Sequence, residues 1–352
     1  MRTRVLLPLL LSLSAALAAP AAAQMPDLAA APEPTAQELE RAQQRAMAWQ
    51  AYGLRVAAAL GRSDGARELA LATLLEATAG PYDPDGHAAT GADARRWRAQ
   101  AEARGGGDVI TWQLRLAAAM AAGEPEAATA AARRWQALSP GNLAPLLHQG
   151  LAPAEVLAAA AGASRNAPDP FPALRWAAGV LTRHPPTRAE WTGFGEGTAP
   201  SAAAQAAAWA SSLLPLLLPD HRGVMEACSG RQLRLQGRAD ACRHMAGLLL
   251  ARPQTVLDER IGLSMARALT RSAAERAPLD ARRRGVDWRQ QQLFELASRE
   301  GRDLAAAERQ ARLLGDPAID GEDALARRTL AAAGIAQEPP ADWRAPWQQP
   351  RR

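Results

Sequence analysis

Lysine is absent from this chain, and all 41 of its basic residues are arginine. A sequence without lysine has no P-loop lysine, no Schiff-base lysine and no Ser-x-x-Lys acyl-transfer site. It also lacks a His-Glu-x-x-His zinc motif and a Gly-x-Ser-x-Gly nucleophile motif. These absences exclude several common hydrolase and nucleotide-binding sites. We therefore assign no catalytic residue, no metal and no cofactor from the sequence.

Residues that favour β-strands are also scarce, with two tyrosines, three phenylalanines and few valines or isoleucines. Strands favour β-branched and aromatic residues, whereas the abundant alanine, leucine, arginine and glutamate favour helices. The composition predicts an all-α protein, and we expect stacked antiparallel helical hairpins that form an α–α superhelix, in one body or two lobes. The ten tryptophans are expected to be buried between helices.

Long apolar runs are missing too, apart from one at the N-terminus. Arg2 and Arg4 precede and flank an apolar run of about 14 residues over 5–18, and small residues up to Ala23 supply a cleavage site. Such a run is too short to span the ~30 Å core of a bilayer. The pattern predicts a signal peptide cleaved after Ala23 and a flexible leader over 24–34. We expect the mature protein in the periplasm or outside the cell, without a transmembrane span.

The charge balance is only mildly basic, with 36 acidic residues and a formal net charge of +5. Removal of a signal peptide that carries Arg2 and Arg4 lowers this charge by two. So small a surplus on an exported chain argues against a nucleic-acid partner. We expect the partner to be another envelope or secreted protein.

Cysteine occurs only twice, as Cys228 and Cys242. In an oxidising compartment an even number of cysteines favours a disulfide, and a turn near Gly237 would bring these two together across a helical hairpin. Closing a loop of this size stabilises a fold by about 3 kcal/mol. The alternative is a metal site that adds His221 and His244. A helix would point Cys242 and His244 about 200° apart, so the spacing predicts a disulfide and no metal.

Capping and turn residues divide the chain into helical segments. Thr35 and Glu38 form a capping box, which predicts a helix from there to about residue 60, and a second helix follows to about residue 79. Short glycine- and proline-containing connections favour antiparallel neighbours. Further helical hairpins are expected over 143–162, 169–183, 201–217, 222–252, 255–276, 280–314 and 321–333.

The segment over 108–142 has a helix, a tight turn, a second helix and a proline exit. The residues that carry this pattern are Trp112, Gly123, Ala128 and Pro140. Their spacing resembles one degenerate unit of the tetratricopeptide family, although Leu116 and Ala119 stand where that family usually has a small residue and an aromatic one. The resemblance implies a helical-repeat protein with an extended concave surface for a partner.

A loop over 184–200 is rich in proline and glycine. It is the predicted connection between an N-terminal lobe over 35–183 and a C-terminal lobe over 201–352. Its glycines follow no strand, which argues against a phosphate-binding loop. A ligand or partner surface is one interpretation of the loop, and a plain connection is the other. The residues that would line such a surface are Glu190, Trp191, Phe194 and Glu196.

Arginines are also concentrated at Arg282, Arg283 and Arg284. The nearby charged residues are Arg271, Arg276, Arg289, Glu275, Asp280 and Asp287. One interpretation is a solvated helix face on which opposite charges alternate. The other is a surface that contacts an acidic partner or an anionic membrane.

Two functions that involve a ligand fit these features, and a purely structural envelope protein without a specific ligand is a third interpretation. The first is an exported helical-repeat protein that binds a protein or peptide partner in the cell envelope, because stacked hairpins create extended surfaces. The second is an envelope hydrolase that acts on glycan or peptide near 184–200. A pocket with a tryptophan and two close carboxyl groups would favour the enzyme, and an open groove would favour binding.

Overall fold

The computed structural model describes residues 35–80, 90–195, 199–235, 237–300 and 303–345. Every regular element in these ranges is a helix, and one isolated bridge pairs Asn142 with Arg165. The elements are α2 (Ala36–Leu60), α3 (Ala66–Ala79), α4 (Ala92–Gly105), α5 (Val109–Ala121), α6 (Pro125–Leu138), η2 (Ala144–His148), α7 (Pro153–Ala160), α8 (Pro170–Thr182), α9 (Arg188–Gly193), α10 (Ala202–Ser212), α11 (Leu214–Leu217), α12 (Arg222–Ala227), η3 (Gln232–Arg234), α13 (Arg238–Ala251), α14 (Val256–Leu269), α15 (Ala273–Glu300), α16 (Leu304–Gly315) and α17 (Glu322–Ala332).

The all-α fold class is therefore confirmed. In the part of the chain that the structure describes, no helix is long and apolar enough to cross a membrane. The predicted signal peptide, the leader over 24–34 and Glu196 lie outside the described residues.

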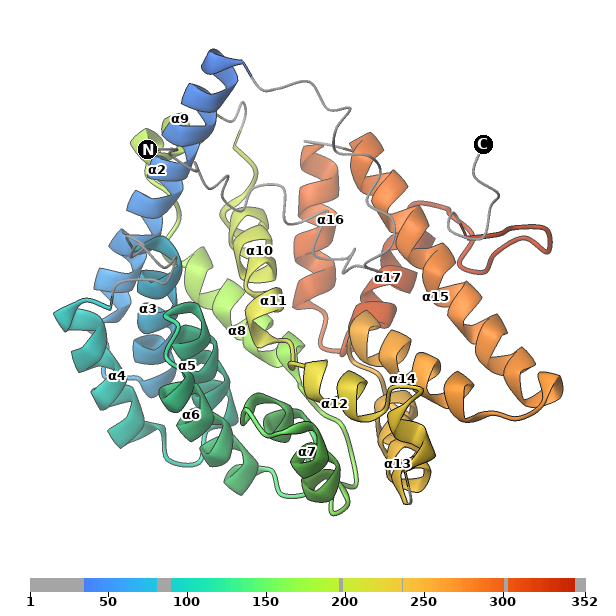
Figure 1. The fold of residues 1–352 in the computed structure, drawn as a ribbon. Helices are drawn as coiled ribbons and strands as arrows, with labels where there is room; N and C mark the ends of the chain where they lie inside the picture. The colour runs from blue at the N-terminus through green and yellow to red at the C-terminus, as the bar shows by residue number, and fades with distance from the viewer. Residues whose placement is uncertain (1–34, 81–89, 196–198, 236, 301–302, 346–352) are drawn as a thin grey trace.

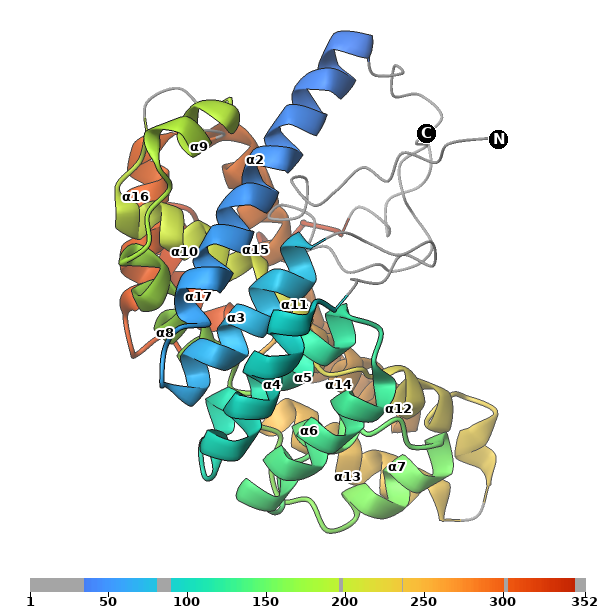
Figure 2. The same cartoon turned by 90° about the vertical axis from the view of Figure 1, so that its left-hand side faces the viewer.

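Helix α2 begins where the sequence predicts. The hydroxyl of Thr35 accepts a hydrogen bond from the backbone N–H of Glu38, and the Glu38 carboxylate accepts one from the Thr35 N–H at 2.7 Å. The first turns of α2 project beyond the body of the molecule (Figures 1 and 2). Burial begins only at Tyr52, because the preceding turns are rich in charged and amide side chains.

The first helices pack around α3, which contacts α2, α4 and α5. Helix α3 lies between α2 and α5, and α5 forms a hairpin with α6. Trp112 and Leu116 from α5 pack with Ala128 and Trp135 from α6 in one buried cluster. Gly123, at the turn between them, has a φ of 66°, a conformation that glycine adopts without a steric penalty. The helix–turn–helix over 108–142 is thus present.

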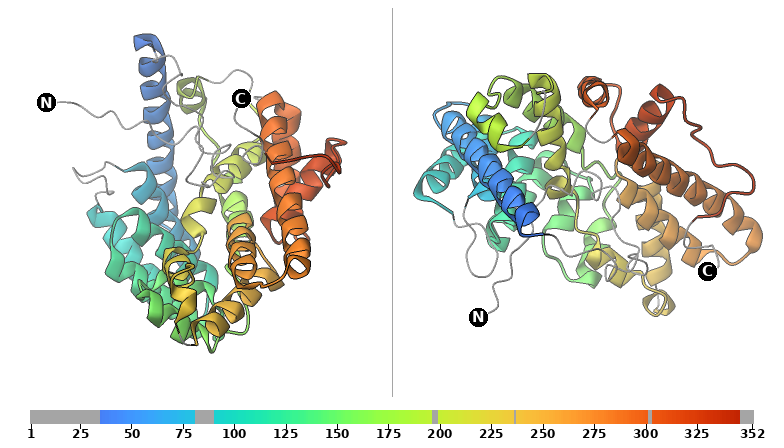
Figure 3. Two further views of the ribbon diagram at one scale, coloured as in Figure 1. Left: turned by 45° about the vertical axis from the view of Figure 1, so that its right-hand side comes forward. Right: turned by 90° about the horizontal axis from the view of Figure 1, so that it is seen from above.

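The later helices do not follow chain order. Helix α10 packs on both α8 and α16, α15 packs on α14 and α17, and the short α11 packs back on α5. In Figure 3, α2 and α15 stand on opposite sides of the molecule. One buried cluster joins Tyr52, Leu174, Ala207 and Leu314. Because this core contains residues from both sides of 184–200, the packing crosses the expected boundary, and the division into lobes stays a prediction.

One predicted helix break is wrong. Helix α14 ends at Leu269, and α15 then runs for 28 residues through Pro278, whereas a connection was expected between hairpins over 255–276 and 280–314. A proline inside a helix removes the bond to the carbonyl four residues earlier. That carbonyl belongs to Ala274, which is exposed, so solvent can satisfy it. Helix α15 forms one wall of an open groove.

The predicted disulfide is present between Cys228, which follows α12, and Cys242 in α13. The two Cα atoms are 5.7 Å apart, within the range that a disulfide spans. Both residues are buried in the cluster formed by α7, α12, α13 and α14. The bond fixes the short α12 against α13.

Candidate functional site

The loop over 184–200 contains the short helix α9, which is anchored to α2. Glu190 forms a bidentate ion pair with Arg55, with both N–O distances at 2.8 Å, and it also accepts a hydrogen bond from the Thr187 N–H. The hydrogen bonds from Arg55 are the main cause that lowers the pKa of Glu190. A general acid in glycoside cleavage needs a raised pKa, so Glu190 has the opposite property.

The aromatic residues of this loop also make contacts within the chain. Phe194 is fully buried, and its ring stacks on Trp49 with a centroid distance of 3.9 Å. Trp191 is half-buried and meets Phe194 edge to face at 5.7 Å. Because Phe194 has no exposed surface, it offers none to a ligand. The structure therefore places Glu190, Trp191 and Phe194 in the anchor of α9 on α2.

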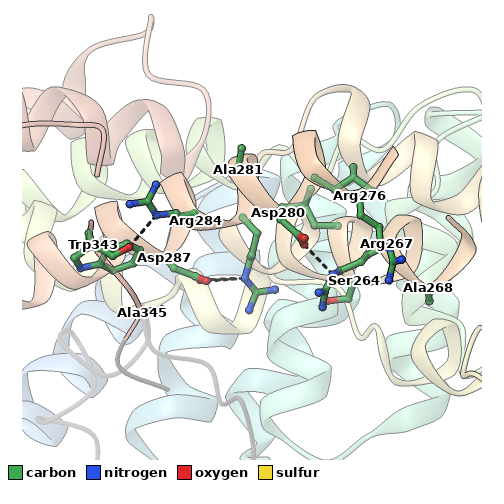
Figure 4. Close-up of a pocket in the computed structure, with 13 residues that line it drawn as sticks. Ser264, Arg267, Ala268, Arg276, Asp280, Ala281, Arg284, Asp287, Trp343 and Ala345 are labelled. Carbon is green, nitrogen blue, oxygen red and sulfur yellow. Dashed lines mark hydrogen bonds and ion pairs between the residues drawn. The ribbon is translucent and has the colours of Figure 1, made fainter. Parts of the chain in front are cut away.

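An open groove lies between α14 and α15 and has a volume of about 740 Å³. One end is bordered by the C-terminal segment, with Trp343 and Ala345 beside Arg284 (Figure 4). Arg267 and Arg276 lie at the other end (Figure 4). Four arginines and two aspartates line the groove, so its walls carry a net positive charge. The lining residues that carry charge are Arg267, Arg276, Arg283, Arg284, Asp280 and Asp287.

The three consecutive arginines of the sequence point in different directions, because successive residues on a helix are about 100° apart. Arg282 turns away from the groove and bonds Glu259 at 2.6 Å. Arg283 bonds Asp287 at 2.9 Å and lines the groove. Arg284 lines it too and bonds the backbone carbonyl of Trp343. Two of the three predicted residues thus belong to the groove.

The arginines of the groove differ in how their charge is balanced. Arg267 pairs with Asp280 at 2.8 Å, and Arg283 shares the buried Asp287 with Arg260. Within the described residues, Arg276 bonds only the carbonyl of Ser272, and Arg284 bonds only carbonyl oxygens. A carbonyl is neutral, so the charges of Arg276 and Arg284 are left without a carboxylate partner there.

The two carboxylates of the groove are poorly placed for glycoside cleavage. Asp280 and Asp287 are seven residues apart on α15, which corresponds to about 10 Å along the helix axis at 1.5 Å per residue. Catalytic carboxyl pairs are about 5 to 9.5 Å apart. Both side chains are also engaged by arginines. The groove is better suited to hold an anion than to transfer a proton.

The N-terminal end of α14 is fixed by a buried polar cluster, which we call the junction. Its members are His148, His221, Asp258 and Glu322. The Nε2 atom of His221 lies 2.7 Å from Oδ1 of Asp258, and both side chains are almost fully enclosed. The Glu322 carboxylate accepts a hydrogen bond of 2.5 Å from the Val256 N–H at the start of α14. The junction joins η2, α12, α14 and α17.

Burial changes the acid–base properties of two members of the junction. It raises the pKa of Glu322 to about 7, against the hydrogen bond from Val256. It lowers the pKa of His148 to about 4, with the nearby His221 acting in the same direction. Neither ring nitrogen of His148 has a hydrogen-bond partner among the described residues. All four side chains of the junction are buried, and none of them lines the groove between α14 and α15.

The histidines near the disulfide do not gather around the sulfur atoms. His221 bonds Asp258, and His244 lies 3.0 Å from the carbonyl oxygen of Ala163. Both cysteines are used in the disulfide. Among the residues that the structure describes, no group of three or more His, Cys, Asp or Glu side chains is arranged to hold a metal ion.

Comparison with known proteins adds no family: no family model, curated protein or solved structure matches this chain. The evidence for a function of the groove therefore comes from its geometry and charge. Arg267 and Trp343 also line the groove, but no sequence pattern links them to α15, because they belong to α14 and to the C-terminal segment. Arg276, Asp280 and Arg284 are spaced at four-residue intervals, which places them near one face of α15. This spacing is the sequence pattern from which the α15 wall of the groove could be predicted.

Proposed function

We propose that this protein binds an acidic segment of a partner protein in the groove between α14 and α15. The observation that carries the proposal is the presence of Arg276 and Arg284 in an open groove of about 740 Å³, neither with a carboxylate partner among the described residues. Arginine binds carboxylates with strong, directional hydrogen bonds. The disulfide favours an oxidising compartment, so we propose an exported protein whose partner is in the cell envelope.

The length of the groove indicates the size of the segment. Arg276 and Arg284 are eight residues apart on α15, which corresponds to about 12 Å along the axis. An extended peptide rises about 3.3 Å per residue, so three to four residues span the distance. A recessed groove suits a peptide better than a flat bilayer, which would contact only its rims. We therefore favour an acidic peptide over an anionic membrane.

The direct test is titration with a fluorescein-labelled peptide of about eight glutamates, followed by anisotropy. We expect saturable binding that weakens as salt rises from about 50 to about 500 mM, because exposed charges are screened. A peptide of glutamines serves as the neutral control. Arg276→Gln should weaken binding roughly tenfold, since one charge-assisted contact is lost. Arg133→Gln, an exposed position on α6, should leave the affinity unchanged.

Two results would contradict the proposal. Equal binding of the glutamate and glutamine peptides would show that charge is not what the groove recognises. Equal weakening by Arg276→Gln and Arg133→Gln would show that only the overall charge of the chain matters. Stronger retention on vesicles that contain phosphatidylglycerol, with no peptide binding, would instead assign the arginines to a membrane surface.

A further inference from the structure

The C-terminal segment over 334–345, which we call the strap, crosses α15 and borders one end of the groove. Trp288 on α15 donates an indole N–H bond of 2.9 Å to the carbonyl of Ala336. The ring of Trp288 meets Trp343 edge to face at a centroid distance of 5.4 Å. Glu338 pairs with Arg327 at 3.1 Å. These contacts hold the strap against α15 and α17, and Glu338 also pairs with Arg289 on α15.

The strap also occupies the guanidinium of Arg284. The Nε atom donates to the carbonyl of Trp343 at 3.0 Å, and Nη2 donates to the carbonyl of Ala341 at 2.9 Å and to that of Pro340. The guanidinium carbon lies 5.9 Å from the centre of the Trp343 ring. The same N–H groups would bind a carboxylate of an acidic peptide. The strap and such a peptide therefore cannot both use this arginine fully.

We propose that the strap is an intrachain competitor that must leave Arg284 before an acidic segment fills that end of the groove. This inference rests on the proposed function. A carboxylate adds a charge–charge attraction and a bidentate geometry that neutral carbonyls do not offer to a guanidinium, so the exchange favours the ligand. The strap lowers the apparent affinity, because only the fraction of molecules with a free Arg284 is competent at both ends of the groove.

The test weakens the strap without substituting any residue that lines the groove. Trp288 does not line the groove, and Trp288→Leu removes both its bond to Ala336 and its contact with Trp343. We expect the glutamate peptide to bind this variant roughly three- to tenfold more tightly. Trp288→Phe keeps a ring against Trp343 and loses only the N–H donor, so its gain should be smaller. Thermal melting of each variant shows whether it is folded.

Hydrogen exchange on the unmodified protein gives a second measurement. The amides of 335–345 should exchange faster when the glutamate peptide is bound, because the strap is released. Unchanged or slower exchange at saturating peptide would overturn the inference, as would equal affinity of the parent and Trp288→Leu. Failure of the glutamate peptide to bind either protein would instead refute the proposed function. The two hypotheses therefore fail on different results.

Discussion

The charged side chains at the two ends of α14 lie in opposite environments, buried at one end and open to solvent at the other. At the N-terminal end, Asp258 and Glu259 are enclosed and each has a partner, His221 and Arg282 respectively. At the C-terminal end, Arg267 and its neighbours lie in an open groove. Buried charge is costly unless it is paired, whereas exposed charge is tolerated without a partner. The comparison separates polar groups that fix the fold from those that are available to a ligand.

This difference predicts how strongly substitutions at each end change stability and peptide binding. Substitutions in the junction should change the free energy of unfolding by several kcal/mol and leave peptide binding intact wherever the protein folds. Substitutions in the groove should change binding and leave stability almost unchanged.

The largest effect is expected for Asp258→Ala. The substitution leaves the ring of His221 buried without its partner at 2.7 Å, and breaking a buried pair costs about 3 to 5 kcal/mol. Urea unfolding followed by circular dichroism measures the loss. Asp258→Asn keeps an acceptor in place and should lose clearly less. Equal stability of the parent and Asp258→Ala would show that the junction does not fix α14.

The disulfide should contribute about 3 kcal/mol to the free energy of unfolding, because it closes the loop between Cys228 and Cys242 in the unfolded chain. It also fixes α12, which His221 directly precedes. We expect reduction, or the double variant Cys228→Ser/Cys242→Ser, to lower the free energy of unfolding by that amount. Peptide affinity of the folded variant should stay within twofold of the parent. A large loss of affinity would show that the disulfide-bonded hairpin also maintains the groove.

The junction also predicts an unusual dependence of stability on pH. The pKa of Glu322 is about 7 in the folded protein, above its ordinary value of 4.5. The unfolded chain therefore releases this proton first, and the contribution of Glu322 to stability falls as pH rises from about 4.5 to about 7. The pKa of His148 is about 4, below its ordinary value of 6.5. Its contribution is lost as pH falls from about 6.5 to about 4.

These two dependences oppose each other, each with a full size of about 3 kcal/mol. Glu322→Gln removes the first and should stabilise the protein most above pH 7. The free energy of unfolding of this variant should rise between about pH 4 and pH 6.5, while that of the parent stays flatter. His148→Gln should show the reverse slope. Parallel pH profiles for the parent and Glu322→Gln would show that this carboxyl group ionises normally in the fold.

The parts of this molecule that sequence could predict are those encoded over short distances. The Thr35–Glu38 capping box and the Cys228–Cys242 pair each depend on residues close along the chain, and both are present. The predicted helix break near Pro278 was wrong, because the carbonyl that loses its hydrogen bond to the proline is exposed to solvent. Local chemistry thus predicted helix starts and the disulfide better than helix continuity.

The junction had no signal in the sequence. Asp258 and His221 are 37 residues apart, and Glu322 and Val256 are 66 apart, with no periodic pattern that links them. The groove was predictable in part, since Arg283 and Arg284 were candidates and lie in it. Its other wall and the strap depend on how α14 and the C-terminal segment pack on α15, and packing of this kind is determined by the whole fold.

The smallest effect on the free energy of unfolding is expected for Asp280→Asn. Asp280 and Arg267 form an ion pair whose side chains are 50% and 60% exposed, and such pairs contribute about 0 to 1 kcal/mol. Chemical unfolding should therefore hardly distinguish this variant from the parent.

Binding should respond in the other direction. Asp280→Asn removes one of the two negative charges from the groove and releases the guanidinium of Arg267, so we expect the glutamate peptide to bind several-fold more tightly at low salt. Glu126→Gln, an exposed acidic position on α6, changes the net charge equally and should not change the affinity. An equal gain in affinity for both variants would show that only the net charge of the protein determines peptide binding. A gain confined to Asp280→Asn would show that the C-terminal end of α14 has its charge placed for a ligand, as the N-terminal end has its charge placed for the fold.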